Sequence, residues 1–160
     1  EVYDENERLM ISARSCCVIV SLETKKPVRL SKGLPENMIK GNQRPVLDEF
    51  DPIADITDAD MERRFTIRMH DLDFNTHVNN SVYIVWALET VPEDIVMNCR
   101  PSVISIQYIG ESLYGDCIIS KSRRVKADSS VKFLHSLHSQ NAQKEITRLK
   151  SIWKPFTFFE

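Results

Sequence analysis

The sequence predicts an α+β fold in which one buried helix packs against a curved, mostly antiparallel sheet. The first observation is a run of seven apolar residues, 82–88, which is too broad for the apolar stripe of a surface helix. The second is the succession of strand-like runs, one before this helix and four after it that are expected to follow one another as hairpins. A helix that is apolar on nearly all sides needs a sheet curled around it, so this order predicts one layered domain.

The helix is expected to span residues 80–90, about 16 Å at the usual rise per residue. Asn79 or Asn80 is a favourable N-cap, and Pro92 disfavours a helical conformation in the residue before it. A strand is the alternative for seven apolar residues, but these flanks favour a helix. Pro92 also opens a predicted short second helix.

Three parts are expected along the chain: strands in residues 1–31, a linker at 32–61 and a domain at 62–160. Val18–Val20 is β-branched and predicts a strand, and a turn leads from it into a second one. The linker holds three of the seven prolines, two of the four glycines and a run of acidic residues from Asp48 to Asp60. The strands predicted in the domain are Phe65–Met69, Ser102–Gly110, Asp116–Lys126, Val131–Gln140 and Glu145–Trp153.

The composition is that of an ordinary globular protein, with 42% hydrophobic residues, 28% charged residues and a net charge of −2. This balance gives no reason to expect binding to nucleic acid or to an anionic membrane. No apolar run approaches the roughly 20 residues of a membrane-spanning helix. The adjacent Cys16 and Cys17 are predicted to be small core residues, and the four cysteines lack the spacing of a metal site, which favours a reducing compartment.

A polar loop precedes the helix and carries groups that hold or move protons. Its imidazole and carboxamides lie beside the positive end of the predicted helix, an arrangement typical of a functional site. Capping and turn formation alone explain Asp71, Asn79 and Asn80, and they explain Asp73 as well as catalysis does. The loop residues with such groups are Asp71, Asp73, Asn75, His77, Asn79 and Asn80.

The run from Asp71 to Glu89, Asp-Leu-Asp-Phe-Asn-Thr-His-Val-Asn-Asn-Ser-Val-Tyr-Ile-Val-Trp-Ala-Leu-Glu, is followed by Tyr108-Ile-Gly-Glu-Ser. Together they resemble the second hotdog domain of the acyl-acyl carrier protein (ACP) thioesterases of bacteria and plant plastids. The segment Val18–Leu30 resembles the closing strands of that family's first hotdog domain. The resemblance implies two hotdog domains in one polypeptide, so we expect this chain to be a C-terminal part of a longer one.

The resemblance implies hydrolysis of acyl-ACP to free fatty acid and holo-carrier protein, which terminates fatty acid synthesis without a cofactor or metal. It carries the catalytic roles onto Asp73, Asn75, His77 and Glu111. Glu111 would act as base or nucleophile, Asn75 and His77 would orient the reacting groups, and Asp73 would fix the imidazole tautomer. The residues expected to contact substrate are Asn79, Asn80, Tyr83, Arg123 and Arg124.

One position departs from an older scheme for plant members, in which a cysteine directly after the glutamate is the nucleophile. Ser112 occupies it here, and an unassisted hydroxyl does not ionise near neutral pH, which favours a carboxylate and water. Arg123 and Arg124 lie in the densest basic cluster, either a solvated surface or a docking site for the acidic carrier protein.

Three alternatives stay open at this stage. The chain can be an acyl-ACP thioesterase, a single-hotdog acyl-CoA thioesterase that works as a dimer, or a non-catalytic acyl-binding module. We also expect a cytoplasmic protein that contacts neither membrane nor nucleic acid and pairs with a second hotdog domain or a second copy through a free sheet edge.

Overall fold

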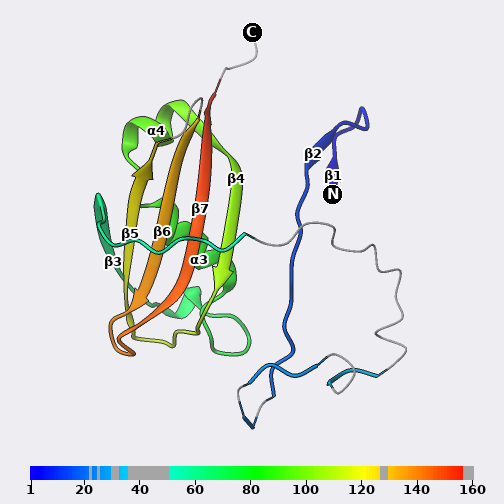
Figure 1. The fold of residues 1–160 in the computed structure, drawn as a ribbon, viewed down its shortest axis with the longest axis vertical. Coiled ribbons are helices and arrows are strands. Elements are labelled where there is room, and N and C mark those ends of the chain that lie inside the picture. Colours follow the sequence, from blue (N-terminus) through cyan, green and yellow to red (C-terminus); the bar gives the residue numbers. More distant parts are fainter. Residues whose placement is uncertain (22, 25, 30–32, 36–50, 127–129, 157–160) are drawn as a thin grey trace. The chain divides into compact units, whose positions relative to one another are not determined.

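The computed structural model describes residues 1–21, 23–24, 26–29, 33–35, 51–126 and 130–156 (Figure 1). The chain divides into two compact units, Glu1–Glu49 and Phe50–Glu160. The second unit therefore begins earlier than the predicted domain boundary at residue 62. Residues 51–61 were assigned to the linker because of their proline and acidic content, but they pack on the sheet of unit 2.

Unit 1 pairs β1 (Val2–Tyr3) with β2 (Leu9–Ile11) in an antiparallel ribbon. The predicted strand at 18–20 is reduced to a single bridge between Val20 and Pro27. Cys16 and Cys17 are exposed, so the prediction that they are core residues is wrong for this chain. The strands described in this unit have two and three residues, too short to build a core around the two thiols.

Unit 2 is built on a five-stranded sheet in the order β3-β5-β6-β7-β4, and every neighbouring pair is antiparallel. The four strands after the helix were predicted to follow one another as hairpins, and for the first of them this is wrong. That strand, β4, lies at the far edge beside β7, with Ile106 opposite Leu149. Residues 109–116 carry the chain across the end of the sheet to β5. The strands are β3 (Met61–Thr66), β4 (Cys99–Tyr108), β5 (Cys117–Val125), β6 (Val131–Ser139) and β7 (Lys144–Pro155).

The strand before the polar loop of residues 71–80, called the site loop below, ends earlier than predicted. β3 stops at Thr66, and Met69 begins the short 3₁₀ helix η1 (Met69–Asp71). Met69 is consequently 79% exposed and does not continue the buried side of the strand. Ile67 is the last residue of this segment to enter the core, at 1% exposure.

The two predicted helices are present as α3 (Asn80–Leu88) and α4 (Glu93–Asn98). α3 is capped by Asn79, whose Oδ1 accepts a hydrogen bond from the Ser81 amide at 3.0 Å. It is buried on the side of Trp86 but not all round, because Val85 is 55% exposed. The sheet therefore covers one face of α3 (Figure 1), and the exposed Val85 lies away from that face.

The core lies between α3 and the concave face of the sheet. Its buried members come from β5, β6, β7, the helix and the two loop positions 67 and 78. Each buried aliphatic side chain stabilises the fold by about 1.5–3 kcal/mol. Phe65 stacks on Trp86 with ring centroids 5.7 Å apart, which holds the entrance of the site loop to the helix. The buried members of this cluster are Ile67, Val78, Tyr83, Trp86, Ala87, Ile118, Leu137, Ile146 and Leu149.

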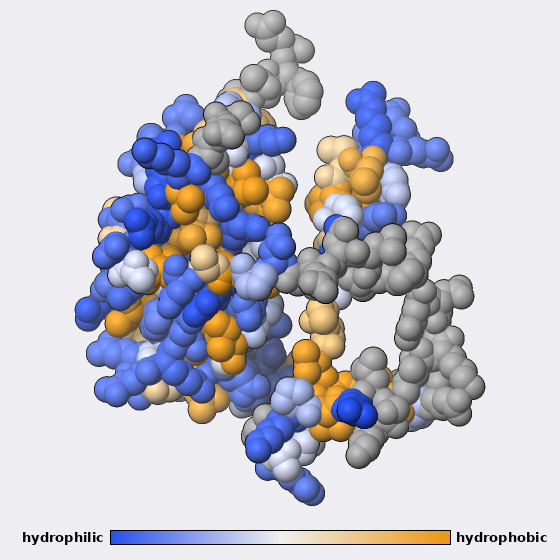
Figure 2. All heavy atoms as spheres, in the orientation of Figure 1, coloured by the Kyte–Doolittle hydropathy of each residue, from blue (hydrophilic) through white to orange (hydrophobic). Residues whose placement is uncertain are grey.

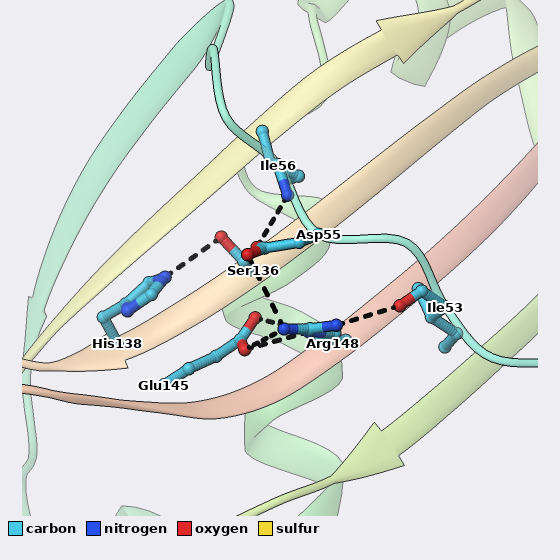
Figure 3. Close-up of polar contacts among 7 residues, drawn as sticks. All are labelled: Ile53, Asp55, Ile56, Ser136, His138, Glu145 and Arg148. Carbon is cyan, nitrogen blue, oxygen red and sulfur yellow. Dashed lines mark hydrogen bonds and ion pairs between the residues drawn. The ribbon is translucent and has the colours of Figure 1, made fainter.

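Residues 51–60 cross the sheet on the face opposite α3 (Figure 1). Arg148 of β7 holds them: its guanidinium donates to the Ile53 carbonyl at 3.2 Å and pairs with Asp55 at 3.7 Å, while Glu145 orients it from the same strand at 2.6 Å (Figure 3). Ile53 is only 6% exposed as a result. Elsewhere this face presents mainly hydrophilic side chains with small apolar patches between them (Figure 2).

Candidate active site

The loop before α3 is a narrow hairpin. The Asn79 amide donates to the Asp71 carbonyl at 2.9 Å, and further in the Asp73 amide donates to the His77 carbonyl at 2.8 Å. Between Asp73 and His77, the Thr76 amide donates to the Asp73 carbonyl at 3.1 Å and closes a turn. Asn75 therefore lies at the exposed tip and His77 on the returning arm.

The segment that crosses the end of the sheet runs alongside this hairpin. The Val78 amide donates to the Ser112 carbonyl at 3.3 Å, and His77 is bridged to Leu113. This pairing brings His77 Nε2 to 3.6 Å from Glu111 Oε2. Their side chains are 39% and 73% exposed, so water and substrate can reach the pair from the surface of unit 2.

Asp73 acts on the backbone of the loop. Its Oδ1 accepts hydrogen bonds from the amides of Asn75 at 2.8 Å and His77 at 3.3 Å. The carboxylate beside the imidazole is Glu111, so the geometry gives Asp73 the role of shaping the turn and not of fixing the tautomer. Among the described residues, the Asn75 carboxamide has no hydrogen-bond partner and is available to a ligand.

Of the three substrate contacts predicted near the helix start, Asn79 and Tyr83 have side chains that serve the fold, while Asn80 presents an exposed side chain and stays a prediction. Asn79 uses its carbonyl oxygen as the N-cap, and the backbone oxygen of Asn80 accepts the Tyr108 hydroxyl at 3.1 Å. Tyr83 is 2% exposed and packs edge-on against Trp86 with centroids 5.8 Å apart. Burial raises the pKa of Tyr83 above its ordinary value of 10, which keeps its phenol neutral beneath the site.

Ser112 is enclosed between the two loops at 2% exposure. Among the described residues its hydroxyl has no partner at full hydrogen-bond geometry, although its interaction with the Tyr83 phenol partly offsets the rise of the Tyr83 pKa. The Ser112 carbonyl accepts from the Val78 amide. A buried, unactivated hydroxyl is poorly placed to attack a substrate. Its position supports a structural role for Ser112.

Arg123 and Arg124 lie toward the far end of β5 from the loops. Cys117 begins the strand next to the site, so Arg123 is about 20 Å along it at the usual rise per residue. The structure thus does not bring these arginines to the His77–Glu111 pair. They line a surface hollow of about 450 Å³, and Arg123 pairs with Asp58 at 3.7 Å. The lining residues are Asp55, Arg123, Arg124, Val125, Lys126 and Leu134.

Within the described part of the chain, no three His, Cys, Asp or Glu side chains are grouped so that they could hold a metal ion. In the same residues, none of the helices has the length and apolar character needed to cross a bilayer.

A helix laid across a five-stranded antiparallel sheet, with a polar hairpin at its start, defines unit 2 as a hotdog domain. Solved structures agree with this fold. The 12:0-ACP thioesterase from Umbellularia californica matches with a TM-score of 0.69 and 24% identity, over 86% of this chain and 52% of its own. An acyl-ACP thioesterase from Bacteroides thetaiotaomicron matches with a TM-score of 0.63 and 22% identity, over 84% of this chain and 53% of its own.

Residues 54–155 match the acyl-ACP thioesterase C-terminal domain, and the chain therefore belongs to the acyl-ACP thioesterase family. The chloroplastic dodecanoyl-[acyl-carrier-protein] hydrolase of Cinnamomum camphora is 36% identical over 92 residues, which cover 56% of this chain and 24% of the relative. The chloroplastic palmitoyl-acyl carrier protein thioesterase of Gossypium hirsutum is 28% identical over 170 residues, which cover 94% and 40%. The chain thus spans less than half the length of these relatives.

Proposed function

We propose that this chain supplies the catalytic domain of a thioesterase that hydrolyses acyl-ACP to free fatty acid and holo-carrier protein, terminating fatty acid synthesis. The observation that carries the proposal is the 3.6 Å contact between His77, on the returning arm of the hairpin, and Glu111 on the neighbouring segment. Family membership supports the same activity. A carboxylate and an imidazole held together by two loops provide a base and a hydrogen-bond donor in one place.

In the proposed reaction Glu111 takes a proton from water as the water oxygen attacks the thioester carbonyl carbon. His77 and the Asn75 carboxamide donate hydrogen bonds to the carbonyl oxygen, where negative charge develops. The tetrahedral intermediate then breaks its C–S bond, and the leaving thiolate takes the proton that Glu111 accepted from water, which restores the carboxylate. Attack by the Glu111 carboxylate itself, followed by hydrolysis of the anhydride, uses the same groups.

Matched substrates test this assignment against the two alternatives. The chain is assayed with one acyl group carried by ACP and by coenzyme A, and the released thiol is measured. A higher kcat/KM on acyl-ACP supports the proposal, whereas a preference for acyl-CoA indicates the single-hotdog type of enzyme. Binding of either thioester without hydrolysis indicates an acyl-binding module.

The proposed enzyme works together with a second hotdog domain. The β4 strand at the edge of the sheet is paired with β7 on one side, and a second sheet can extend it on the other. The cytoplasmic location predicted from the sequence stays a prediction, and the plant relatives reported above are named as chloroplastic proteins.

The basic cluster gives a prediction about the carrier protein. We expect Arg123→Glu with Arg124→Glu to raise KM for acyl-ACP several-fold at low salt, because these arginines would face an acidic partner. The difference should shrink as ionic strength screens the charges. The measurement is KM on acyl-ACP and on acyl-CoA at salt concentrations from about 20 to about 500 mM, over which surface charge becomes screened.

Lys154→Glu is the control for this pair of substitutions, since Lys154 is an exposed base like the two arginines but lies near the end of β7, outside the hollow. An equal rise in KM for acyl-CoA, or no rise for acyl-ACP, would contradict a docking role and leave the cluster as a solvated surface.

A further inference from the structure

We propose that Thr76 is a positioning residue for the hydrolysis, because its left-handed backbone turns the hairpin so that the His77 imidazole meets Glu111. The inference rests on the proposed function and adds to it a residue for which the sequence gives no signal. Thr76 has φ = 64°, in the region that favours glycine, and it immediately precedes His77.

The hairpin tip has the form of a three-residue β-hairpin loop. A turn from Asp73 is closed by the Thr76 amide, and the next residue, His77, pairs back to the Asp73 amide. Such loops place a left-handed residue directly after the turn, usually glycine. Without that conformation at position 76 the returning arm would leave in another direction and His77 would not meet its partner strand.

A threonine in this conformation is unusual, because a branched Cβ crowds the backbone when φ is positive. Its side chain is exposed and makes no hydrogen bond among the described residues, so no side-chain contact compensates. The loop contacts on either side impose the conformation instead. These are the Asp73 carboxylate on two amides and the bridge of His77 to Leu113. Unfavourable backbone conformations that the surroundings impose occur most often at functional sites.

The consequence for catalysis is geometric. His77 Nε2 and Glu111 Oε2 are 3.6 Å apart, which is long for a hydrogen bond. A change of φ at Thr76 would displace the whole His77 imidazole relative to Glu111. A displacement of about 1 Å in a catalytic group lowers rates by about 10²-fold. Thr76 therefore affects kcat, while KM for the acyl substrate stays nearly unchanged.

Three substitutions test the backbone requirement. Thr76→Asn and Thr76→Gly accept a positive φ and are expected to keep kcat within about threefold of the unchanged chain. Thr76→Pro fixes φ near −65° and removes the amide that closes the turn onto Asp73, and it is expected to lower kcat about 10²-fold with KM little changed. Gln143→Pro is the matched control, because Gln143 is exposed, has φ = 50° and lies in the turn between β6 and β7. It is expected to leave kcat unaffected.

A second readout does not depend on hydrolysis. Glu111→Gln should shift the NMR signals of the His77 imidazole in the unchanged chain and in Thr76→Asn, and should leave them unmoved in Thr76→Pro. If the chain hydrolyses no thioester, the proposed function fails while this coupling still reports on Thr76. The inference is overturned if Thr76→Pro keeps both kcat and the coupling, or if Thr76→Asn loses both.

Discussion

Replacing Glu111 with glutamine is expected to lower kcat for acyl-ACP hydrolysis by about 10²–10⁴-fold, the usual contribution of a positioned general base. The carboxamide has nearly the same size as the carboxylate but cannot accept the proton of the attacking water or serve as a nucleophile. Because the side chain is 73% exposed, its loss leaves no cavity and should not change the thermal midpoint of unfolding. The measurement is steady-state release of thiol from acyl-ACP, with the folded state checked by circular dichroism.

Two further variants make this result specific. Glu93→Gln, at the exposed start of α4, removes an equivalent charge away from the loops and should retain full activity. Ser112→Ala removes the buried hydroxyl that a nucleophile scheme would need and is expected to retain most activity. Loss of hydrolysis in Ser112→Ala together with its survival in Glu111→Gln would transfer the nucleophile to Ser112 and contradict the water mechanism.

The sequence predicted those parts of the site that depend on local chemistry. Neighbouring residues alone determine three features: the polar run before an apolar helix, the N-cap at Asn79 and the short helix after Pro92. The structure contains each of them. The proximity of Glu111 to His77 followed from the family resemblance. Composition alone would leave Glu111 as an acid after a strand, because the two positions are far apart along the chain.

Features that depend on distant contacts were not predictable in the same way. The position of β4 beside β7 depends on how the chain crosses the end of the sheet, and the turn residues at 115–116 fit a hairpin equally well. Residues 51–60 read as a linker until Arg148, far along the chain, is seen to hold the Ile53 carbonyl. The positive φ of Thr76 contradicts the preference of its own side chain, so only the folded loop reveals it.

The second large expected effect is a dependence of stability on pH, and it comes from a series of buried, hydrogen-bonded side chains beneath α3. His135 on β6 is 0% exposed, and its ring is hydrogen-bonded at both nitrogens. Nδ1 lies 3.3 Å from the Thr90 hydroxyl, which itself donates to the Ala87 carbonyl at 2.6 Å. On the other side, Nε2 lies 2.9 Å from the Ser151 hydroxyl, which accepts from the Trp153 indole at 2.9 Å.

This arrangement assigns the neutral ring with its proton on Nδ1. The Thr90 hydroxyl has used its hydrogen on Ala87 and therefore accepts from Nδ1, whereas Ser151 keeps its hydrogen for Nε2. A second ring proton would face the Ser151 hydroxyl and displace that hydrogen bond. Burial lowers the pKa of His135 from 6.5 to about 4. The low pKa and the hydrogen bonds therefore both favour the neutral ring.

The unfolding free energy should therefore fall as the solution is acidified. The unfolded chain binds a proton at His135 near pH 6.5 and the folded chain only near pH 4, so the stability is complete above about pH 6.5 and is lost progressively toward pH 4. At about 1.4 kcal/mol per pH unit, this interval corresponds to about 3 kcal/mol. For a domain of this size, that loss is a large fraction of the total stability.

Denaturant unfolding of the full chain at several pH values between 7 and 4 measures this effect. His135→Gln should flatten the pH dependence by about 3 kcal/mol across the interval, whatever its stability at pH 7. His138→Gln is the matched control, because His138 lies three residues along the same strand, half-buried on the opposite face, and the variant keeps the His135 ring with its partners. The same acid sensitivity in His135→Gln as in the unchanged chain would place the titrating group elsewhere, since the carboxylates are present in both proteins.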